Sequence, residues 1–244
     1  MRKFITALIL VLLLGASANA AFLFDGSDYI SLADNAALSL PDGPWTVCVR
    51  IKFTSRTGTT VRDIWHWETG TPFFRLRIGD AGAGVAPDDI NVTITDNDGT
   101  SIAFSTSNDP FASNTSDTSV CLQRSGTTVT VYVNGVSNGS GSNAAINGVD
   151  VAANFILGNN GPSVGNTATF LGSMTDFAKW DTALSVDQMA SFAKGFSANC
   201  YLNPLKVYVQ GIREYQELHN GIAVTNSGTT VTDQPRILYC GSNM

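Results

Sequence analysis

Apolar and polar residues alternate along several short segments of the chain. In residues 45–53 every odd-numbered position is apolar, whereas the even-numbered positions carry Thr46, Cys48, Arg50 and Lys52. A period of two is typical of an antiparallel β-strand that buries one face. Residues 127–133 repeat the pattern and run into Asn134-Gly135, a dipeptide typical of a tight hairpin turn.

One short helix is predicted among these strands. Ser185 is suited to cap its N-terminus, and Gln188, three residues later, completes a capping box. The apolar stripe before Gly195 consists of Val186, Met189, Ala190 and Phe192. Many short strands with a single helix predict an all-β fold, a two-sheet antiparallel jelly-roll sandwich.

The first 20 residues have the pattern of a secretory signal peptide. Arg2 and Lys3 precede an apolar run over residues 5–14, and a stretch of small residues ends at Ala20. We therefore expect cleavage after Ala20 and a secreted, extracellular protein. The apolar run is too short to span a bilayer, which takes about 20 residues, and no transmembrane segment is predicted in the mature chain.

The charge balance argues against one class of partner. The 244 residues include 14 Lys and Arg against 20 Asp and Glu, a net charge of −6. Removing the leader takes away Arg2 and Lys3 and no acidic residue, so the mature chain carries −8. Nucleic-acid binding is excluded on this ground, because it needs cations to replace the counterions of the phosphate backbone.

The mature chain contains four cysteines, and secretion favours disulfides. Four cysteines allow three pairings. Cys48 and Cys121 each sit within a predicted strand, and two neighbouring strands would bring them together. Cys200 and Cys240 bracket the C-terminal segment and would tie it down. The favoured pairs are Cys48–Cys121 and Cys200–Cys240.

Several segments resemble one known family. Residues 24–30 (FDGSDYI) look like the opening strand of laminin-G-like domains, and residues 45–53 resemble their next conserved strand. Residues 125–135 resemble the family's hairpin, while 170–180 (FLGSMTDFAKW) followed by Ala183-Leu184-Ser185 resemble its closing strand and helix. The resemblance implies a concanavalin A-like sandwich over residues 21–199, with one concave and one convex sheet.

Residues 200–244 lie beyond the usual end of such a domain. They are similar, more loosely, to tails that follow laminin-G-like domains in phage and environmental sequences. We expect a small C-terminal β appendage, clipped by Cys200–Cys240, because about 40 residues are marginal as an independent unit.

The resemblance also directs attention to glycoside hydrolysis, since glucanases share this fold. The glucanases that this chain resembles in fold usually carry Glu, Asp and Glu at alternate positions of one strand. Glycoside hydrolysis needs two carboxyl groups that flank the scissile bond. Glutamate occurs here only at Glu68, Glu214 and Glu217, and no such run exists. No catalytic residue is therefore predicted.

Calcium is the cofactor that the resemblance implies. Related domains often hold a structural calcium ion near the Asp-Gly of the first strand and the Asp before the closing strand, which correspond to Asp25, Gly26 and Asp176. Trp65 and Trp67 are candidates for a sugar-stacking platform, although two core tryptophans in one strand are the favoured interpretation.

The sequence therefore predicts a secreted module that binds a glycan or glycoprotein surface, with calcium as a possible aid, and that catalyses nothing. A structural or adhesive surface protein of a phage virion or cell envelope is the alternative. A glycoside hydrolase or lyase comes third. The choice of a glycan rests on family analogy, because a fold does not fix a function.

Overall fold

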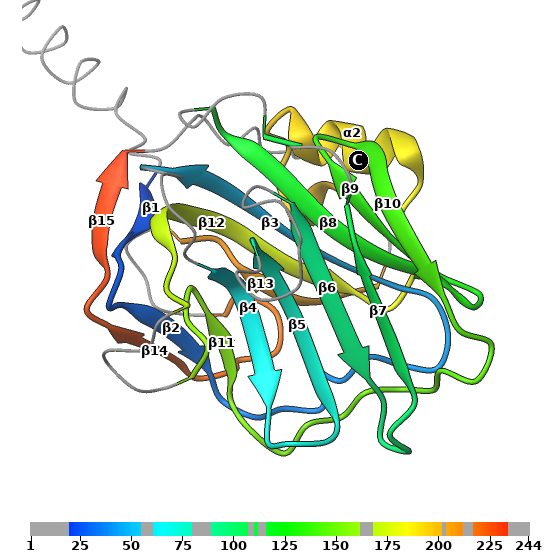
Figure 1. The fold of residues 1–244 in the computed structure, drawn as a ribbon. Helices are drawn as coiled ribbons and strands as arrows, with labels where there is room; N and C mark the ends of the chain where they lie inside the picture. The colour runs from blue at the N-terminus through cyan, green and yellow to red at the C-terminus, as the bar shows by residue number, and fades with distance from the viewer. Residues whose placement is uncertain are drawn as a thin grey trace, which may run out of the picture.

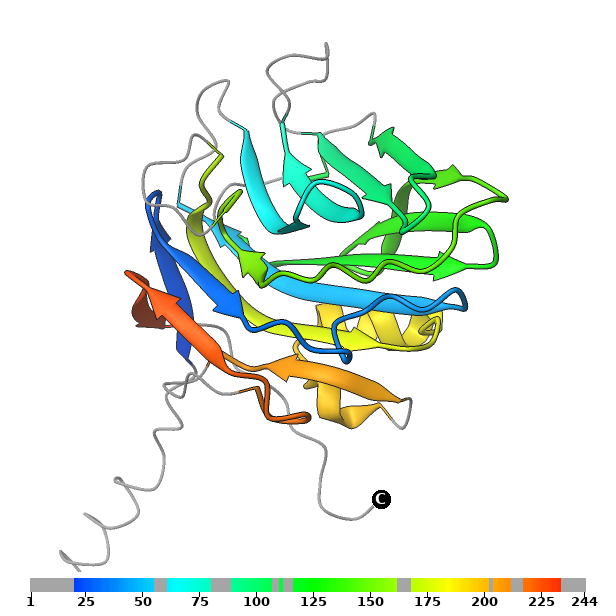
Figure 2. The same cartoon turned by 90° about the horizontal axis from the view of Figure 1, so that it is seen from below.

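Two antiparallel β-sheets pack face to face in the computed structural model (Figures 1 and 2). The structure describes residues 20–54, 61–79, 89–106, 110–111, 116–161, 168–201, 204–211 and 217–233. The predicted leader, apart from Ala20, lies outside the described residues. Within them, no helix is both long and apolar enough to cross a bilayer.

The first sheet has eight strands. In spatial order they are β10 (Val136–Ser142), β9 (Thr128–Val133), β8 (Thr118–Ser125), β3 (Trp45–Phe53), β12 (Leu171–Trp180), β1 (Ala20–Asp25) and β15 (Thr230–Asp233), with β13 (Leu205–Val209) paired to β12 beyond the end of β1. Helix α2 (Val186–Ala193) and a 3-10 turn at Ala198–Cys200 follow β12.

The second sheet has seven strands. Their spatial order is β14 (Val224–Ser227), β2 (Tyr29–Leu32), β11 (Phe155–Leu157), β4 (Arg62–Glu68), β5 (Phe73–Ile78), β6 (Ile90–Thr95) and β7 (Ser101–Ser105). The jelly-roll sandwich predicted from the alternating segments is confirmed.

The core lies between the sheets and is rich in aromatic rings. Trp65 and Trp67 of β4 point into it and are fully buried. The ring centroids of Trp65 and Phe74 lie 5.4 Å apart, and those of Trp67 and Phe155 lie 5.9 Å apart. Neither tryptophan is available as a platform for a ligand, because both are part of the packing that joins the sheets.

The outer face of the first sheet is buried as well. Strand β3 is buried along almost its whole length, so the expectation of one solvated face is wrong. The reason is that α2, capped by Ser185 and Gln188 as predicted, lies over this face, as Figure 2 shows. Met189 and Phe192 of the helix form a second apolar cluster with the Cys48–Cys121 disulfide and Trp180.

The two strands that carry Cys48 and Cys121 pair directly, with these residues opposite each other. The predicted Cys48–Cys121 disulfide is present. Cys200 is also disulfide-bonded, and its predicted partner Cys240 lies outside the described residues.

The C-terminal segment is built into the sandwich more closely than an appendage would be. Strand β15 extends the first sheet beside β1, and β14 extends the second beside β2 (Figure 1). The buried carboxylate of Glu217 accepts hydrogen bonds from the backbone amides of Tyr208 (2.9 Å) and His219 (2.8 Å). Open strand edges offer unpaired backbone groups, and the tail satisfies them at one side of both sheets.

Removing the disulfide between β3 and β8 should destabilise the protein without changing its fold. The crosslink joins residues 73 positions apart, and closing a loop of that length restricts the unfolded chain. We expect the Cys48→Ala/Cys121→Ala variant to lose about 2–4 kcal/mol of unfolding free energy in urea titrations. A loss below about 0.5 kcal/mol would contradict this role.

Candidate functional site

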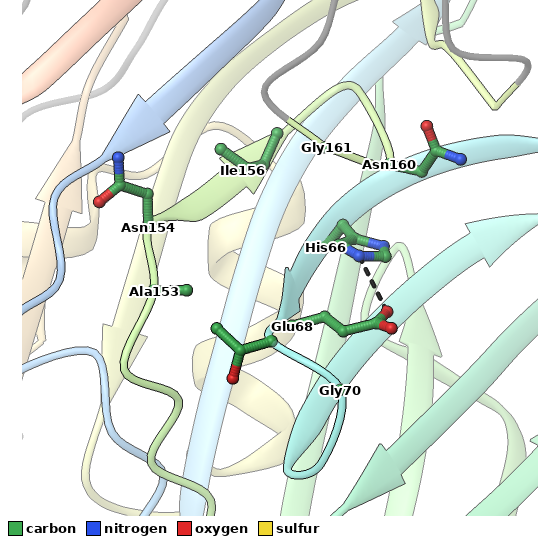
Figure 3. Close-up of a pocket in the computed structure, with 9 residues that line it drawn as sticks. His66, Glu68, Gly70, Ala153, Asn154, Ile156, Asn160 and Gly161 are labelled. Carbon is green, nitrogen blue, oxygen red and sulfur yellow. Dashed lines mark ion pairs between the residues drawn. The ribbon is translucent and has the colours of Figure 1, made fainter.

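A groove opens on the outer face of the second sheet, beside β4 and β11 (Figure 3). Its volume is about 640 Å³, within the range of small-molecule sites. Its lining comes from β4 and the turn after it, and from β11 and the segments on both sides of it: His66, Glu68, Thr69, Gly70, Ala153, Asn154, Ile156, Asn160 and Gly161.

The pleat of β4 places two polar side chains in this groove. Successive side chains of a strand point to opposite faces, so the inward Trp65 and Trp67 leave His66 and Glu68 on the outside. Across the groove, Ile156 of β11 is the register partner of His66. The opposite wall is tied to the core, because Trp67 Nε1 donates a hydrogen bond of 2.7 Å to the carbonyl of Ala153.

A sharp bend after β11 brings the second wall into place. Gly158 has a φ of 83°, a region that side-chain-bearing residues rarely adopt, and a Cβ there would collide with the ring of Phe24. The Gly158 amide donates to the carbonyl of Ile64 at 3.1 Å. These contacts turn the chain toward Asn160 and Gly161.

His66 lies between two carboxylates. Its Nε2 is 3.0 Å from Oε2 of Glu68, and its Nδ1 is 3.4 Å from Oδ2 of Asp63, a contact without hydrogen-bond geometry. Asp63 is fully buried, and Arg77 Nε donates to its Oδ1 at 2.9 Å. The charge of Asp63 is therefore balanced behind the groove, whereas the side chain of Glu68 is 36% exposed.

The side-chain oxygens of the two asparagines in the groove are not open to a ligand. The side-chain oxygen of Asn160 is buried and has no protein partner. Asn154 uses its side-chain oxygen to accept from the amide of Asp34 (3.3 Å). The Asn160 oxygen is closed to solvent, so a ligand in the groove does not reach it without a movement of the side chain.

The described lining of the groove does not present the pair of carboxyl groups that glycoside hydrolysis needs. Among the described lining residues, Glu68 is the one carboxylate. Glycoside hydrolysis needs two carboxyl groups that flank the scissile bond. Asp63 lies nearby, but it is buried beneath His66 and held by Arg77, so it cannot reach a substrate in the groove.

The calcium ligands implied by the resemblance do not come together. Asp25 is exposed and its carboxylate accepts from the amide (3.1 Å) and hydroxyl (2.9 Å) of Ser27, while Gly26 turns the chain with a φ of 100°. Asp25 pairs with Leu171, so Asp176 lies five positions farther along β12, roughly 16 Å away. These three residues do not fit one calcium ion, and the described residues contain no group of three or more His, Cys, Asp or Glu placed to hold a metal.

Asp176 instead anchors the layer that covers the first sheet. Its Oδ2 forms an ion pair with Arg50 Nη1 at 3.1 Å, and its Oδ1 accepts a hydrogen bond of 2.7 Å from the Tyr208 hydroxyl. Arg50 also donates to the carbonyls of Phe192 (3.1 Å) and Phe196 (3.0 Å). Burial raises the pKa of Asp176, and Arg50 and Tyr208 oppose that rise.

A family model described as the concanavalin A-like lectin/glucanases superfamily matches residues 24–190. The chain belongs to this superfamily. The match covers most of the described sandwich, including both walls of the groove. Among curated protein sequences, none matches the chain closely enough to count as a relative.

Several solved structures share the fold. A Bacteroides ovatus protein, provisionally described as carbohydrate binding, superposes with a TM-score of 0.70 at 20% identity, covering 91% of this chain and 62% of its own. A heptameric pentraxin from Limulus polyphemus gives 0.59 at 17% identity (88% and 95%). Domain 4 of a Geobacillus stearothermophilus arabinanase, bound to arabinotriose, gives 0.51 at 20% identity (71% and 76%). At these identities the likeness shows the fold alone.

The sequence singles out two of the groove residues but does not show which residues surround them in the fold. Glu68 stands out as one of three glutamates, and His66 as the polar residue between two tryptophans. The alternation that buries the tryptophans also predicts that both face outward. No local pattern marked Asn154 or Asn160, because they meet β4 only through the pairing of β11.

Removing the cation from the buried pair at Asp176 should cost more than removing both charges. Arg50→Met leaves the Asp176 carboxylate buried without its cation, which typically costs about 3–5 kcal/mol. Asp176 has a φ of 53°, a conformation that Asn tolerates, so Arg50→Met/Asp176→Asn is a suitable double variant. We expect it to recover at least about 1 kcal/mol in urea unfolding. Equal losses for the two variants would contradict the coupling.

Proposed function

We propose that this protein is a non-catalytic carbohydrate-binding module that takes a short glycan in the groove beside β4 and β11. The observation that carries the proposal is the groove itself, about 640 Å³ in volume, with imidazole, carboxylate, amide and hydroxyl groups in its lining. A sugar ring presents hydroxyl groups in several directions, and the polar groups of the lining can form hydrogen bonds with these hydroxyls.

The shape of the groove supports the same ligand. Gly70, Ala153 and Gly161 carry little or no side chain and leave room for a ring between the polar groups (Figure 3). Ile156 lies in the lining at the register position next to His66, with 2% of its surface exposed. Ligand sites generally combine such room with a few well-placed polar groups.

The relatives support a glycan as well. The arabinanase domain of the same fold was solved with arabinotriose, and the Bacteroides ovatus protein is provisionally described as carbohydrate binding.

We also propose secretion, because the leader pattern agrees with a Cys48–Cys121 disulfide, a bond typical of oxidising compartments. Calcium assistance stays a prediction, and the binding test includes it as a variable.

A glycan array screened with and without calcium tests the proposal, and titration calorimetry on the hits gives affinities. Thr69→Trp should weaken binding, because Thr69 is exposed at the groove and an indole there takes up part of its volume without disturbing the core. Asn160→Ala should weaken binding about tenfold, the effect of one or two hydrogen bonds.

Asn138→Ala is the matched control, since this asparagine lies on β10 of the other sheet and its side-chain oxygen also lacks a partner. Its affinity should equal that of the wild type. Silence of the array in both conditions would contradict glycan binding and favour a structural or adhesive role. Release of sugar from a polysaccharide, abolished by Glu68→Gln, would instead indicate a hydrolase.

A further inference from the structure

Charge is distributed unevenly around the groove. Glu68 and its neighbour His66 are the titratable side chains among the described lining residues. Arg77, on the adjacent strand, is turned to the buried Asp63 (2.9 Å). Arg75 is the register partner of His66, and its guanidinium lies 5.7 Å from the ring centre of Phe73. The described lining therefore offers a carboxylate to the ligand, with neither of these arginines in it.

The carboxylate of the groove points to the same chemistry. Oε2 of Glu68 faces His66, which leaves its other oxygen to accept from a ligand. A carboxylate is an acceptor at both oxygens and binds donors such as hydroxyl or ammonium groups strongly. A carboxylate or sulfate on the ligand would meet Glu68 as a like charge.

We infer that Glu68 is a specificity residue that makes the groove select sugars with hydroxyl or ammonium groups and reject sugars with carboxylate or sulfate groups. The inference rests on the proposed glycan binding. His66 acts as a positioning residue, because its Nε2 contact holds the Glu68 carboxylate at the groove. The net charge of −6 adds long-range repulsion of acidic polysaccharides.

Matched trisaccharides test the selection. We would titrate the protein with β-1,4-linked trimers of glucose, glucosamine and glucuronic acid, and with the corresponding galactose-configured series. In the series that binds, the neutral and ammonium-bearing trimers should bind at least about tenfold more tightly than the acidic trimer. Glu68→Gln should reduce this ratio about tenfold, because the amide keeps the shape but removes the charge.

Asp187→Asn is the charge-matched control. Asp187 is exposed on α2, which covers the other sheet, so its loss should leave the ratio unchanged. His66→Ala should lower the ratio in the wild-type background and have no further effect in the Glu68→Gln background, since its action passes through Glu68. Loss of structure alone would not depend on the background in this way.

Two results would overturn the inference while glycan binding stands. One is equal affinity of the wild type for acidic and neutral trimers, which would implicate Arg75 as a ligand-facing cation. The other is an unchanged ratio in Glu68→Gln. If the array is silent and no trimer of either series binds the wild type, the proposed function fails, and the inference fails with it.

Discussion

The alternation of side chains across the pleat of β4 is the constraint on which both the core and the groove depend. Trp65 and Trp67 must point inward to fill the space between the sheets, and this requirement forces His66 and Glu68 outward. A shift of register by one residue would bury the carboxylate and expose an indole. Trp67 also reaches the carbonyl of Ala153, so the same packing that stabilises the sandwich positions the opposite wall of the groove.

The two sheets differ in whether their outer face is covered. The second sheet keeps its outer face open at the groove, whereas α2 and the 3-10 turn at Ala198–Cys200 cover the outer face of the first. The cover needs a polar anchor because β3 presents Arg50 on that face. Arg50 and Asp176 neutralise each other. Arg50 also bonds to the chain after α2, and Asp176 bonds to Tyr208 of β13, so these two buried charges hold the covering layer on the sheet.

Local patterns predicted most of the fold and little of the site. The period of two, the hairpin at Asn134-Gly135 and the capping box at Ser185 depend on neighbouring residues, and each is present in the structure. The groove depends on β11 meeting β4 about 90 positions earlier in the chain, so no window of sequence marks Asn160. The family resemblance makes Asp176 a candidate calcium ligand, whereas its ion pair with Arg50 on another strand has no local signature that would predict it.

The separation of core and groove explains how one fold can carry different binding preferences. The groove side chains come from one face of β4 and from the connections around β11, whereas the sheet-to-sheet packing uses the other face. A change at Glu68 or Thr69 alters what the groove accepts and leaves the buried aromatic contacts in place. Identities of 20% or less to structures with the same fold are compatible with this arrangement, because such similarity fixes the scaffold and leaves the outward positions free. The identity of the ligand therefore depends on the side chains of the groove, such as Glu68, His66 and Asn160. Membership of the superfamily restricts only the size and shape of what can bind on this face of the sheet.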